Sequence, residues 1–417
     1  MPTHDQYIMP NGMVVLGQPM EAVQTAAFVF MLPAGSSRMP EGTCGAANVI
    51  ADWLFRGAGD MDSRQLCDAL DGLGLQRYTA VDHTHLTIGA TMEASHLHQA
   101  LGLYGEVISR PWLDPEQFEL ARQLAIDEVK ALDDDPQEKV LLELKERFYP
   151  YPLGRHPVGR IDQLQSLQAQ HVASLLGQHI RPSRAIFGVA GMYDFGQVCD
   201  QLEALFGQDS TAGPEPIRPG PVGPRYTHIP LESAQVHIGL MTPTVGPADP
   251  DYYHARVTVS ILSGGMSSRL FVQVREKRGL CYAVNARYHC LKEAAGIICY
   301  AGTTPPHAQQ TLQIIIDQFR GLSQGLTDSE LDRAKAGLKS GLILSSESST
   351  RRAAAICTDY HLLGRVRDLD QIKAAIDAVT IEGIQDFLAR HPFDDFTVVT
   401  IGPNPVELPW DHGIQAA

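Results

Sequence analysis

The stretch that organises this sequence is Cys44–Asp60, CGAANVIADWLFRGAGD, in which a helix is expected from about Gly45. Two apolar runs rich in strand-forming residues precede it, VVLGQP from Val14 and AAFVFMLPAG from Ala26. A longer strand is expected after it, over TAVDHTHLTIGAT from Thr79, followed by amphipathic helices and a last strand at AIFGVAG. This succession predicts a sheet with helices packed on it.

The same succession recurs in the second half of the chain. Strands are expected at AQVHIGLMTP, CYAVNARYHC and GIICYAGT, and a helix at YYHARVTVSILSGG. LDPEQFELAR begins at Leu113 and LTDSELDRAK at Leu326, an offset of 213, while the helix ends at His179 and His391 are 212 apart. Helix composition alone could produce such a match, but two pairs that agree within one residue favour an internal duplication.

A Pro/Gly-rich segment, GPEPIRPGPVGP at Gly213–Pro224, separates the two halves, because prolines and glycines there disfavour both helix and strand. We therefore expect an N-terminal domain over 1–212, a linker over 213–224 and a C-terminal domain over 225–417. The expected fold class is α+β, with two homologous domains that each carry a mostly antiparallel sheet.

The composition and net charge of the chain limit the classes of partner that it can bind. A chain of 417 residues with 44% hydrophobic content can bury a large core, and its net charge of −15 repels nucleic acid and anionic membranes. This acidity is either ordinary for a soluble protein or the sign of a preference for basic peptides. No targeting segment and no apolar run of about 18 residues is visible, so a cytoplasmic location is expected. The seven cysteines are odd in number and lack CxxC spacing, which indicates reduced thiols.

The helix within Cys44–Asp60 resembles that of the insulinase, pitrilysin and mitochondrial-processing-peptidase family of zinc peptidases. Catalytic members carry a sequence similar to HFLEHMLFKGT, in which two histidines bind zinc and a glutamate activates water. Aligning Phe55-Arg56-Gly57 with FKG implies that Asn48 and Asp52 occupy the histidine positions and Ala51 the glutamate position. The resemblance also places Glu128 at the distant ligand position, and it extends through FYPYPLGRHPVGRIDQL from Phe148.

This degenerate set is expected to bind no zinc, because it holds no histidine and Ala51 cannot transfer a proton. Asp52 and Glu128 could instead retain a hard-cation site, although solvated or hydrogen-bonded helix carboxylates are the more ordinary expectation. His83 and His85 would share one face of a strand, as metal ligands need, but no third partner can be identified nearby.

The segment Leu262–Tyr288, LSGGMSSRLFVQVREKRGLCYAVNARY, predicts a short helix with Ser267 as N-cap and Gly279 just beyond its end. It resembles the family's C-terminal half, where an arginine and a tyrosine seven residues later reach the substrate across a clamshell chamber. The resemblance gives these roles to Arg275 and Tyr282. Alternatively, they are an ordinary surface cation and strand aromatic. The SGG turn is similar to the glycine-rich loop of the processing peptidase's non-catalytic subunit.

The resemblance implies a non-catalytic subunit of a heterodimeric zinc peptidase. A homologous chain with HxxEH would hold the zinc, and a peptide substrate would add to a sheet edge, for which the strand around TAVDHTHL is the candidate. A silent peptide-binding or scaffold protein, similar to respiratory-complex core subunits, is the alternative. An enzyme with another metal or nucleophile is disfavoured, because no activated Ser or Cys constellation is recognisable.

Overall fold

The computed structural model describes residues 4–209 and 216–408, which form an α+β protein of two compact units. Each unit is assembled from separate stretches of the chain. The first unit comprises Met1–Ala131, Tyr151–Gly220 and Ile343–Asp368. The second comprises Leu132–Pro150, Pro221–Leu342 and Leu369–Ala417.

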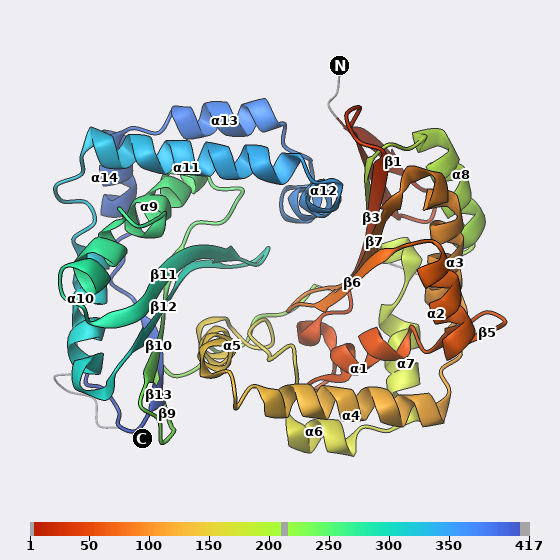
Figure 1. Cartoon of the computed structure of the whole chain (residues 1–417), viewed down its shortest axis with the longest axis horizontal. Coiled ribbons are helices and arrows are strands. Elements are labelled where there is room, and N and C mark those ends of the chain that lie inside the picture. The colour runs from red at the N-terminus through yellow and green to blue at the C-terminus, as the bar shows by residue number, and fades with distance from the viewer. Residues whose placement is uncertain (1–3, 210–215, 409–417) are drawn as a thin grey trace. The chain divides into compact units, whose positions relative to one another are not determined.

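The first unit contains a six-stranded sheet in the order β1-β2-β8-β3-β7-β6 (Figure 1). All neighbouring strands are antiparallel except the parallel pair of β2 and β8. The strands are β1 Asp5–Ile8, β2 Val14–Pro19, β3 Thr25–Leu32, β6 Gln76–Val81, β7 Leu86–Glu93 and β8 Ile186–Gly191. A separate two-stranded ribbon is formed by β4 Gly57–Ala58 and β5 Met61–Asp62.

The second unit contains a five-stranded sheet in the order β11-β12-β10-β13-β9, with a single parallel pair, β13 and β9. Its strands are β9 Tyr226–Pro230, β10 Val236–Thr244, β11 Cys281–Cys290, β12 Ala295–Thr303 and β13 Thr397–Gly402. Without β1, the first sheet has the same order and the same parallel pair at the same place. This agreement supports the internal duplication and the predicted fold class.

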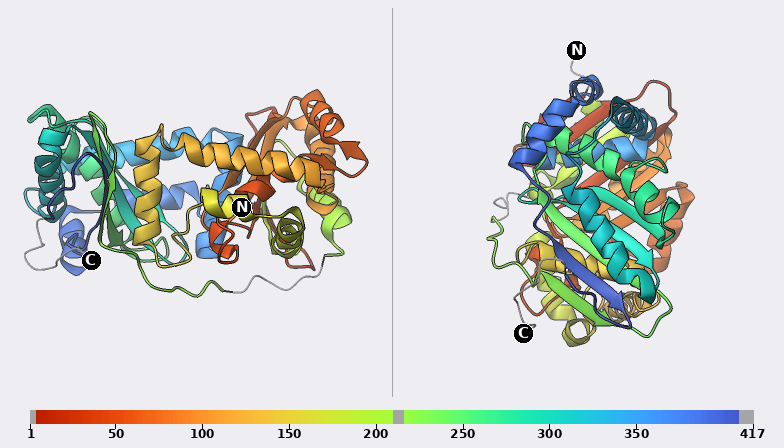
Figure 2. Two further views of the ribbon diagram at one scale, coloured as in Figure 1. Left: turned by 90° about the horizontal axis from the view of Figure 1, so that it is seen from below. Right: turned by 90° about the vertical axis from the view of Figure 1, so that its left-hand side faces the viewer.

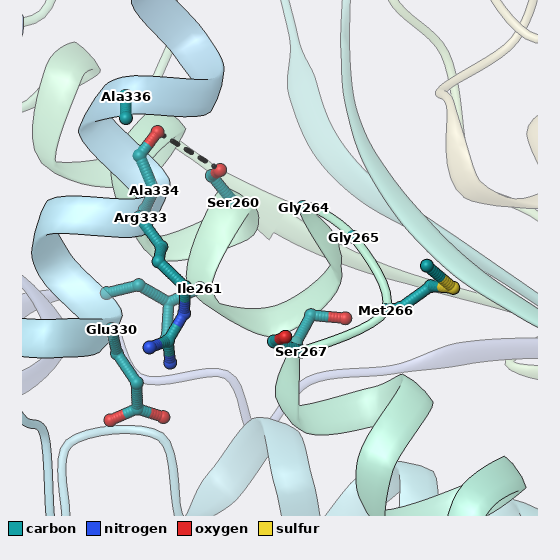
Figure 3. Close-up of a pocket in the computed structure, with 11 residues that line it drawn as sticks. Ser260, Ile261, Gly264, Gly265, Met266, Ser267, Glu330, Arg333, Ala334 and Ala336 are labelled. Carbon is teal, nitrogen blue, oxygen red and sulfur yellow. Dashed lines mark hydrogen bonds between the residues drawn. The ribbon is translucent and has the colours of Figure 1, made fainter.

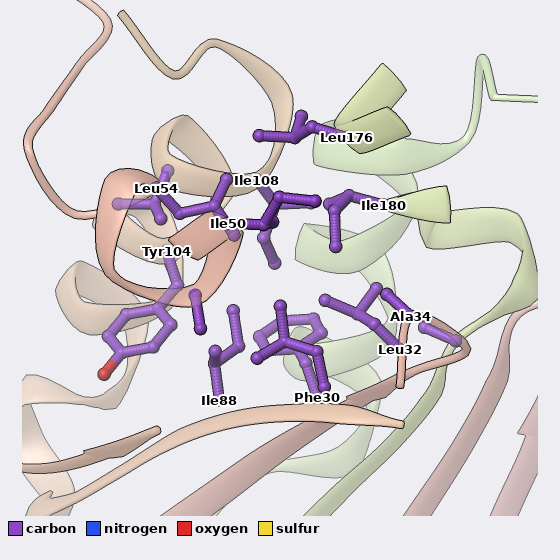
Figure 4. Packing of buried hydrophobic residues seen from close by; sticks show 14 of the residues in the cluster. Phe30, Leu32, Ala34, Ile50, Leu54, Ile88, Tyr104, Ile108, Leu176 and Ile180 are labelled. Atoms are coloured by element: carbon purple, nitrogen blue, oxygen red, sulfur yellow. The ribbon is translucent and has the colours of Figure 1, made fainter. Parts of the chain in front are cut away.

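One face of the first sheet carries a core of side chains from several helices. Phe30, Leu32 and Ile88 of the sheet lie opposite Ile50 of α1 and Tyr104 of α3 (Figure 4). The helices of this unit are α1 Ala46–Trp53, α2 Ser63–Gly72, α3 Leu97–Ser109, α4 Pro115–Ala131, α6 Ile161–Ser166, α7 Ala169–His179, α8 Phe195–Phe206 and α12 Ser349–Leu363.

The helices of the second unit repeat the spacing seen in the sequence. α4 begins at Pro115 and α11 at Asp328, and the ends of α7 and α14 fall at His179 and Arg390. The helices are α5 Pro136–Phe148, α9 Tyr252–Ser263, the π-helical turn η4 Phe271–Glu276, α10 Ala308–Arg320, α11 Asp328–Ser346, α13 Leu369–Asp377 and α14 Ile381–Arg390. The last residues of α11, from Ile343 onward, belong to the first unit.

The two units exchange a helix. α5 comes from the first half of the sequence but packs on β10 and β13, as Figures 1 and 2 both show. α12 comes from the second half but packs on β2, β3 and β8. The strands of the first sheet lie within 5–191 and those of the second within 226–402, whereas each compact unit also includes one helix from the other half of the sequence. The domain bounds 1–212 and 225–417 stay a prediction. Of the predicted linker, residues 213–215 lie outside the described residues and 216–224 form neither helix nor strand.

Close packing of α12 on β8 requires a glycine at position 188. A Cβ atom there would lie 2.4 Å from Cys357 Sγ and 2.7 Å from the Ala353 carbonyl oxygen. Gly188→Ala is therefore expected to lower the free energy of unfolding by about 1–3 kcal/mol, measured by urea denaturation. Gly102→Ala in α3 is the control, since the atom nearest to its Cβ is 4.0 Å away and alanine favours helix. Equal stability of Gly188→Ala and the native chain would contradict this packing.

The expected single strand over TAVDHTHLTIGAT is wrong. β6 and β7 form a hairpin, and residues 82–85 form the turn between them. The carboxylate of Asp82 accepts hydrogen bonds from the backbone N–H groups of Thr84, at 2.6 Å, and His85, at 2.7 Å. Such a side-chain-stabilised turn competes with an extended strand.

Within the described residues, no helix combines the length and the apolar character needed to cross a lipid bilayer. The cytoplasmic location stays a prediction.

Candidate functional site

Helix α1 carries the three residues, Asn48, Ala51 and Asp52, that the resemblance assigns to the zinc-binding motif. It starts after Gly45, whose φ of 97° and close contact with Leu164 leave no room for a side chain. Asn48 and Asp52 are one helical turn apart and half-buried, whereas Ala51 is buried among the core residues.

Helix α4 brings the fourth predicted position to the same place. Asn48 Nδ2 donates a hydrogen bond of 2.5 Å to Glu128 Oε2, although the two residues are 80 positions apart in the sequence. α1 and α4 pack directly against each other. The alignment through Phe55-Arg56-Gly57 thus selects residues that meet in the folded chain.

Asp52 faces a different partner. Its carboxylate accepts a hydrogen bond from Nε of Arg56 and forms an ion pair with it, and Arg56 also donates to Gln117 Oε1 at 3.3 Å. The Arg56 guanidinium places a positive charge beside the Asp52 carboxylate, which opposes binding of a cation by that carboxylate. Across residues 4–209 and 216–408, no group of three or more His, Cys, Asp or Glu side chains is arranged to hold a metal ion.

This donor set does not fit zinc. Zinc sites in proteins use imidazole, thiolate and carboxylate ligands, and the neutral amide of Asn48 is a poor substitute. Asn48 already donates a hydrogen bond to the Glu128 carboxylate, and Arg56 already forms an ion pair with the Asp52 carboxylate. Ala51 can neither take a proton from water nor donate one to a leaving amine.

His83 and His85 lie in the β6–β7 turn, not on a strand as predicted. Both are buried. His83 Nδ1 is 3.2 Å from the Arg155 carbonyl oxygen, and His85 Nδ1 is 2.8 Å from Thr84 Oγ1. The His85 ring also packs edge-on against His361, with 4.3 Å between centroids. Buried packing and polar contacts with Arg155 and Thr84 account for both imidazoles.

Arg275 lies in the second unit, in the π-helical turn η4. Its guanidinium stacks over the Phe271 ring at 5.0 Å, and its carbonyl accepts a hydrogen bond from Gly279 N at 3.0 Å. Gly279 has φ of +60°, as expected of the glycine just beyond a helix. Ser267 is not the N-cap as predicted. The helix begins after Ser268, whose carbonyl accepts a hydrogen bond from Val272 N. Sequence gave no signal for the π-helical form.

Tyr282 is the second residue of the edge strand β11, and 67% of its surface is accessible. A bulge between Cys281 and Ala283 takes it out of the regular register with β12. Burial raises the pKa of the neighbouring Cys281 thiol to about 11, an effect that the positive charge of Arg275 partly offsets. No hydrogen bond or ion pair joins the side chains of Arg275 and Tyr282 to the described residues.

Strand β6 is the outer strand of the first sheet, at the edge opposite β1, and among the strands of residues 4–209 and 216–408 it pairs only with β7. One row of its backbone N–H and C=O groups therefore faces away from the sheet. This is the geometry that an extended peptide needs to add as a further strand.

A pocket of about 310 Å³ in the second unit was not predicted. The glycine turn Gly264-Gly265 and the exposed Met266 line one side, and Glu330 and Arg333 of α11 line the other (Figure 3). The SGG sequence is its only sequence signal. Arg269 donates to Glu330 Oε1 at 2.7 Å and Oε2 at 3.1 Å, which holds α11 beside the turn.

The hydrogen bonds from Arg269 hold the pKa of Glu330 below its ordinary value of 4.5. A lowered carboxyl pKa stabilises the folded chain above the unfolded-state pKa, and this contribution is lost as the pH falls through the folded-state pKa. Glu330→Gln is expected to cost about 1–3 kcal/mol of unfolding free energy at pH 7, and less near about pH 3. Urea denaturation at both pH values tests this, with the exposed Glu293→Gln as control. A cost of Glu330→Gln that does not vary with pH would contradict it.

Two family models match the chain. Residues 14–159 match the insulinase (peptidase family M16) model, and residues 166–338 match the peptidase M16 inactive domain. An uncharacterised zinc protease of Mycobacterium bovis is 28% identical over 397 residues, covering 92% of this chain and 89% of that protein. One from Bacillus subtilis is 25% identical over 407 residues, covering 96% and 98%.

Solved structures show the same fold. A peptidase M16 inactive domain from Pseudomonas fluorescens aligns with a TM-score of 0.86 at 20% identity, covering 97% of this chain and all 100% of that one. A chain of complex III from Candida albicans aligns with a TM-score of 0.84 at 19% identity, covering 96% of both.

The fold defines a two-domain α+β protein, in which Asn48, Asp52 and Glu128 stand at the zinc-ligand positions only as far as the predicted alignment holds. The chain belongs to the insulinase family, peptidase family M16.

Proposed function

We propose that this chain is the non-catalytic subunit of a heterodimeric zinc metallopeptidase and that it supplies Arg275 and Tyr282 to a peptide bound near its partner's zinc. The observation that carries the proposal is a contrast. Asn48 donates a hydrogen bond to Glu128, whereas no hydrogen bond or ion pair joins the side chains of Arg275 and Tyr282 to the described residues.

The two side chains suit that role. A guanidinium donates forked hydrogen bonds to a peptide carbonyl. A phenol donates a hydrogen bond to the oxyanion that develops when water attacks that carbonyl. The outer edge of β6 supports binding of an extended peptide by backbone hydrogen bonds. The partner in this proposal is a homologous chain that contains HxxEH and holds the zinc.

A mixing experiment tests the proposal. Cleavage of an unstructured peptide is measured for this chain, for an HxxEH-bearing homologue from the same source, and for their mixture, with zinc determined in each. We expect this chain alone to be inert and the mixture to cleave faster than the homologue alone. Cleavage by this chain alone with bound zinc would overturn the proposal.

The second candidate is a silent scaffold or peptide-binding protein. This candidate is supported by the fold that the chain shares with one chain of the complex III structure, where that chain is part of a larger assembly. In this case a mixture would form a complex without any gain in cleavage.

A further inference from the structure

The pocket between the glycine turn and α11 has the size and the lining of a small-molecule site. Its volume of about 310 Å³ lies at the lower end of the range for such sites, roughly 300–1,000 Å³. Its apolar part is formed by Ile261, Met266, Ala334 and Ala336. Ligand sites combine such a surface with a few polar groups that fix the orientation of the ligand. The polar groups of this pocket therefore indicate what it can bind.

The acidic side chain that lines the pocket is already paired. Glu330 Oε1 accepts a hydrogen bond from Arg269 Nε at 2.7 Å, and Oε2 accepts from Arg269 Nη2 at 3.1 Å. Thr327 N and Thr327 Oγ1 also donate to Oε2, each at 3.1 Å. The remaining donors of Arg269 are used by the backbone carbonyls of residues 322, 324 and 325. The charges of Glu330 and Arg269 therefore cancel.

The basic side chain of the pocket is not neutralised in this way. Arg333 is exposed, and Figure 3 shows its guanidinium extending from α11 into the space between that helix and Ser267. It donates one hydrogen bond, to Ser329 Oγ at 2.5 Å, and forms no ion pair within residues 4–209 and 216–408. A guanidinium carries five N–H groups, so most of them remain for a ligand. The pocket thus has an excess of one positive charge.

A second polar group of the pocket lacks a partner. Ser268 lines the pocket from the side of the glycine turn and is 8% exposed. Its backbone N–H donates to the Gly265 carbonyl, and its own carbonyl accepts from Val272 N, both at 3.0 Å. Its hydroxyl makes no hydrogen bond to the described part of the chain and is not closed off from solvent. A nearly buried hydroxyl without a partner costs free energy, which a ligand or water would recover.

We propose that this pocket binds a carboxylate attached to a short apolar group. The guanidinium fork of Arg333 matches the two oxygens of a carboxylate, and the Ser268 hydroxyl can donate to one of them. A single excess charge suits a carboxylate better than a phosphate group, whose charge is about −1.5 to −2. The apolar walls take the rest of the ligand. The carboxylate could belong to a free short-chain acid or to the C-terminal residue of a peptide, since both present the same two oxygens.

This site does not depend on the proposed peptidase role, because neither Arg275 nor Tyr282 lines the pocket. Binding is measured on this chain alone, without a partner and without cleavage. Failure of this proposal and failure of the mixing experiment are therefore separate results.

The test measures binding to the full-length chain by saturation-transfer NMR, with the Tm followed in parallel. The probes are 4-methylpentanoate and its neutral amide, 4-methylpentanamide, which has the same shape. We expect the acid to bind with saturation and to raise the Tm. The amide should bind at least about tenfold more weakly, because it lacks the charge that pairs with a guanidinium. Acetate should also bind at least about tenfold more weakly, because it lacks the apolar group.

Three results of this comparison would overturn the proposal. They are the absence of saturable binding of 4-methylpentanoate, equal binding of the acid and its amide, and equal binding of the acid and acetate.

Variants place the ligand in the pocket. Arg333→Gln should weaken 4-methylpentanoate at least about tenfold, and Ser268→Ala by about threefold to tenfold. Arg333→Lys retains the charge but not the fork, so its affinity should lie between those of the native chain and Arg333→Gln. Lys335→Gln is the matched control, since it removes a cation of α11 that does not line the pocket. Circular dichroism checks each fold. Unchanged binding by a folded Arg333→Gln chain would overturn the proposal.

A further probe distinguishes the two sources of the carboxylate. N-acetyl-leucine is 4-methylpentanoate with the added amide group of a peptide's C-terminal residue. Tighter binding of N-acetyl-leucine than of 4-methylpentanoate would identify a peptide end. Equal or weaker binding would identify a free acid.

Discussion

Replacing Arg275 with alanine in the proposed two-chain enzyme is expected to lower kcat by about 10²–10³-fold, because a donor to the developing oxyanion or the scissile carbonyl is lost. Tyr282→Phe, which removes only the phenol hydroxyl, should lower kcat in the same direction. Both side chains are exposed, so neither change should disturb folding. Steady-state kinetics of the mixture, with circular dichroism of each variant, provides the measurement.

Lys277→Ala is the matched control, since it removes a cation from the same exposed helix end without touching the proposed machinery. Its kcat should stay within about twofold of the native value. If Arg275→Ala and Tyr282→Phe leave cleavage by the mixture unchanged, the scaffold function is the better description.

Restoring the zinc motif should produce a large gain. The variant N48H/A51E/D52H places two histidines one turn apart on α1, opposite Glu128. Neighbouring ligands of a tetrahedral zinc ion lie about 3.4 Å apart, and Asn48 Nδ2 is now 2.5 Å from Glu128 Oε2. Position 48 is therefore already close to the third ligand of the variant. We expect zinc content to rise to about one ion per chain.

Elemental analysis after dialysis measures the bound zinc. Adding Glu128→Gln to the variant should remove it, because the third ligand is lost. Adding Arg56→Gln should tighten binding, since it removes the positive charge that Asp52 balances in the native chain. If N48H/A51E/D52H takes up no zinc, α1 and α4 do not preserve the ligand geometry of the family.

Local patterns predicted most of the secondary structure. The run VVLGQP matches β2, CYAVNARYHC matches β11, and the helix expected from about Gly45 is α1. These segments have strong apolar periodicity and clear glycine boundaries, so neighbouring residues alone determine them. The duplicated halves were also visible, since helix starts 213 residues apart recur at Pro115 and Asp328.

Features that depend on side-chain partners could not be predicted. The turn at Asp82 interrupts a continuous strand pattern through hydrogen bonds from its own carboxylate. The hydrogen bond between Asn48 and Glu128 joins two residues that only an alignment could relate. Exchange of α5 and α12 leaves no trace in composition, because a helix has the same apolar stripe whichever sheet it covers.

That exchange also sets an order of events during synthesis of the chain. The first sheet is complete once β8 has been made, yet Ala27, Val29 and Ala190 on one of its faces are buried in a cluster with Ala353 and Cys357 of α12. Since α12 ends at Leu363, the ribosome must add more than 150 further residues before that face is covered. Until then the nascent chain carries an open apolar surface, which makes it a substrate for chaperones and a risk for aggregation.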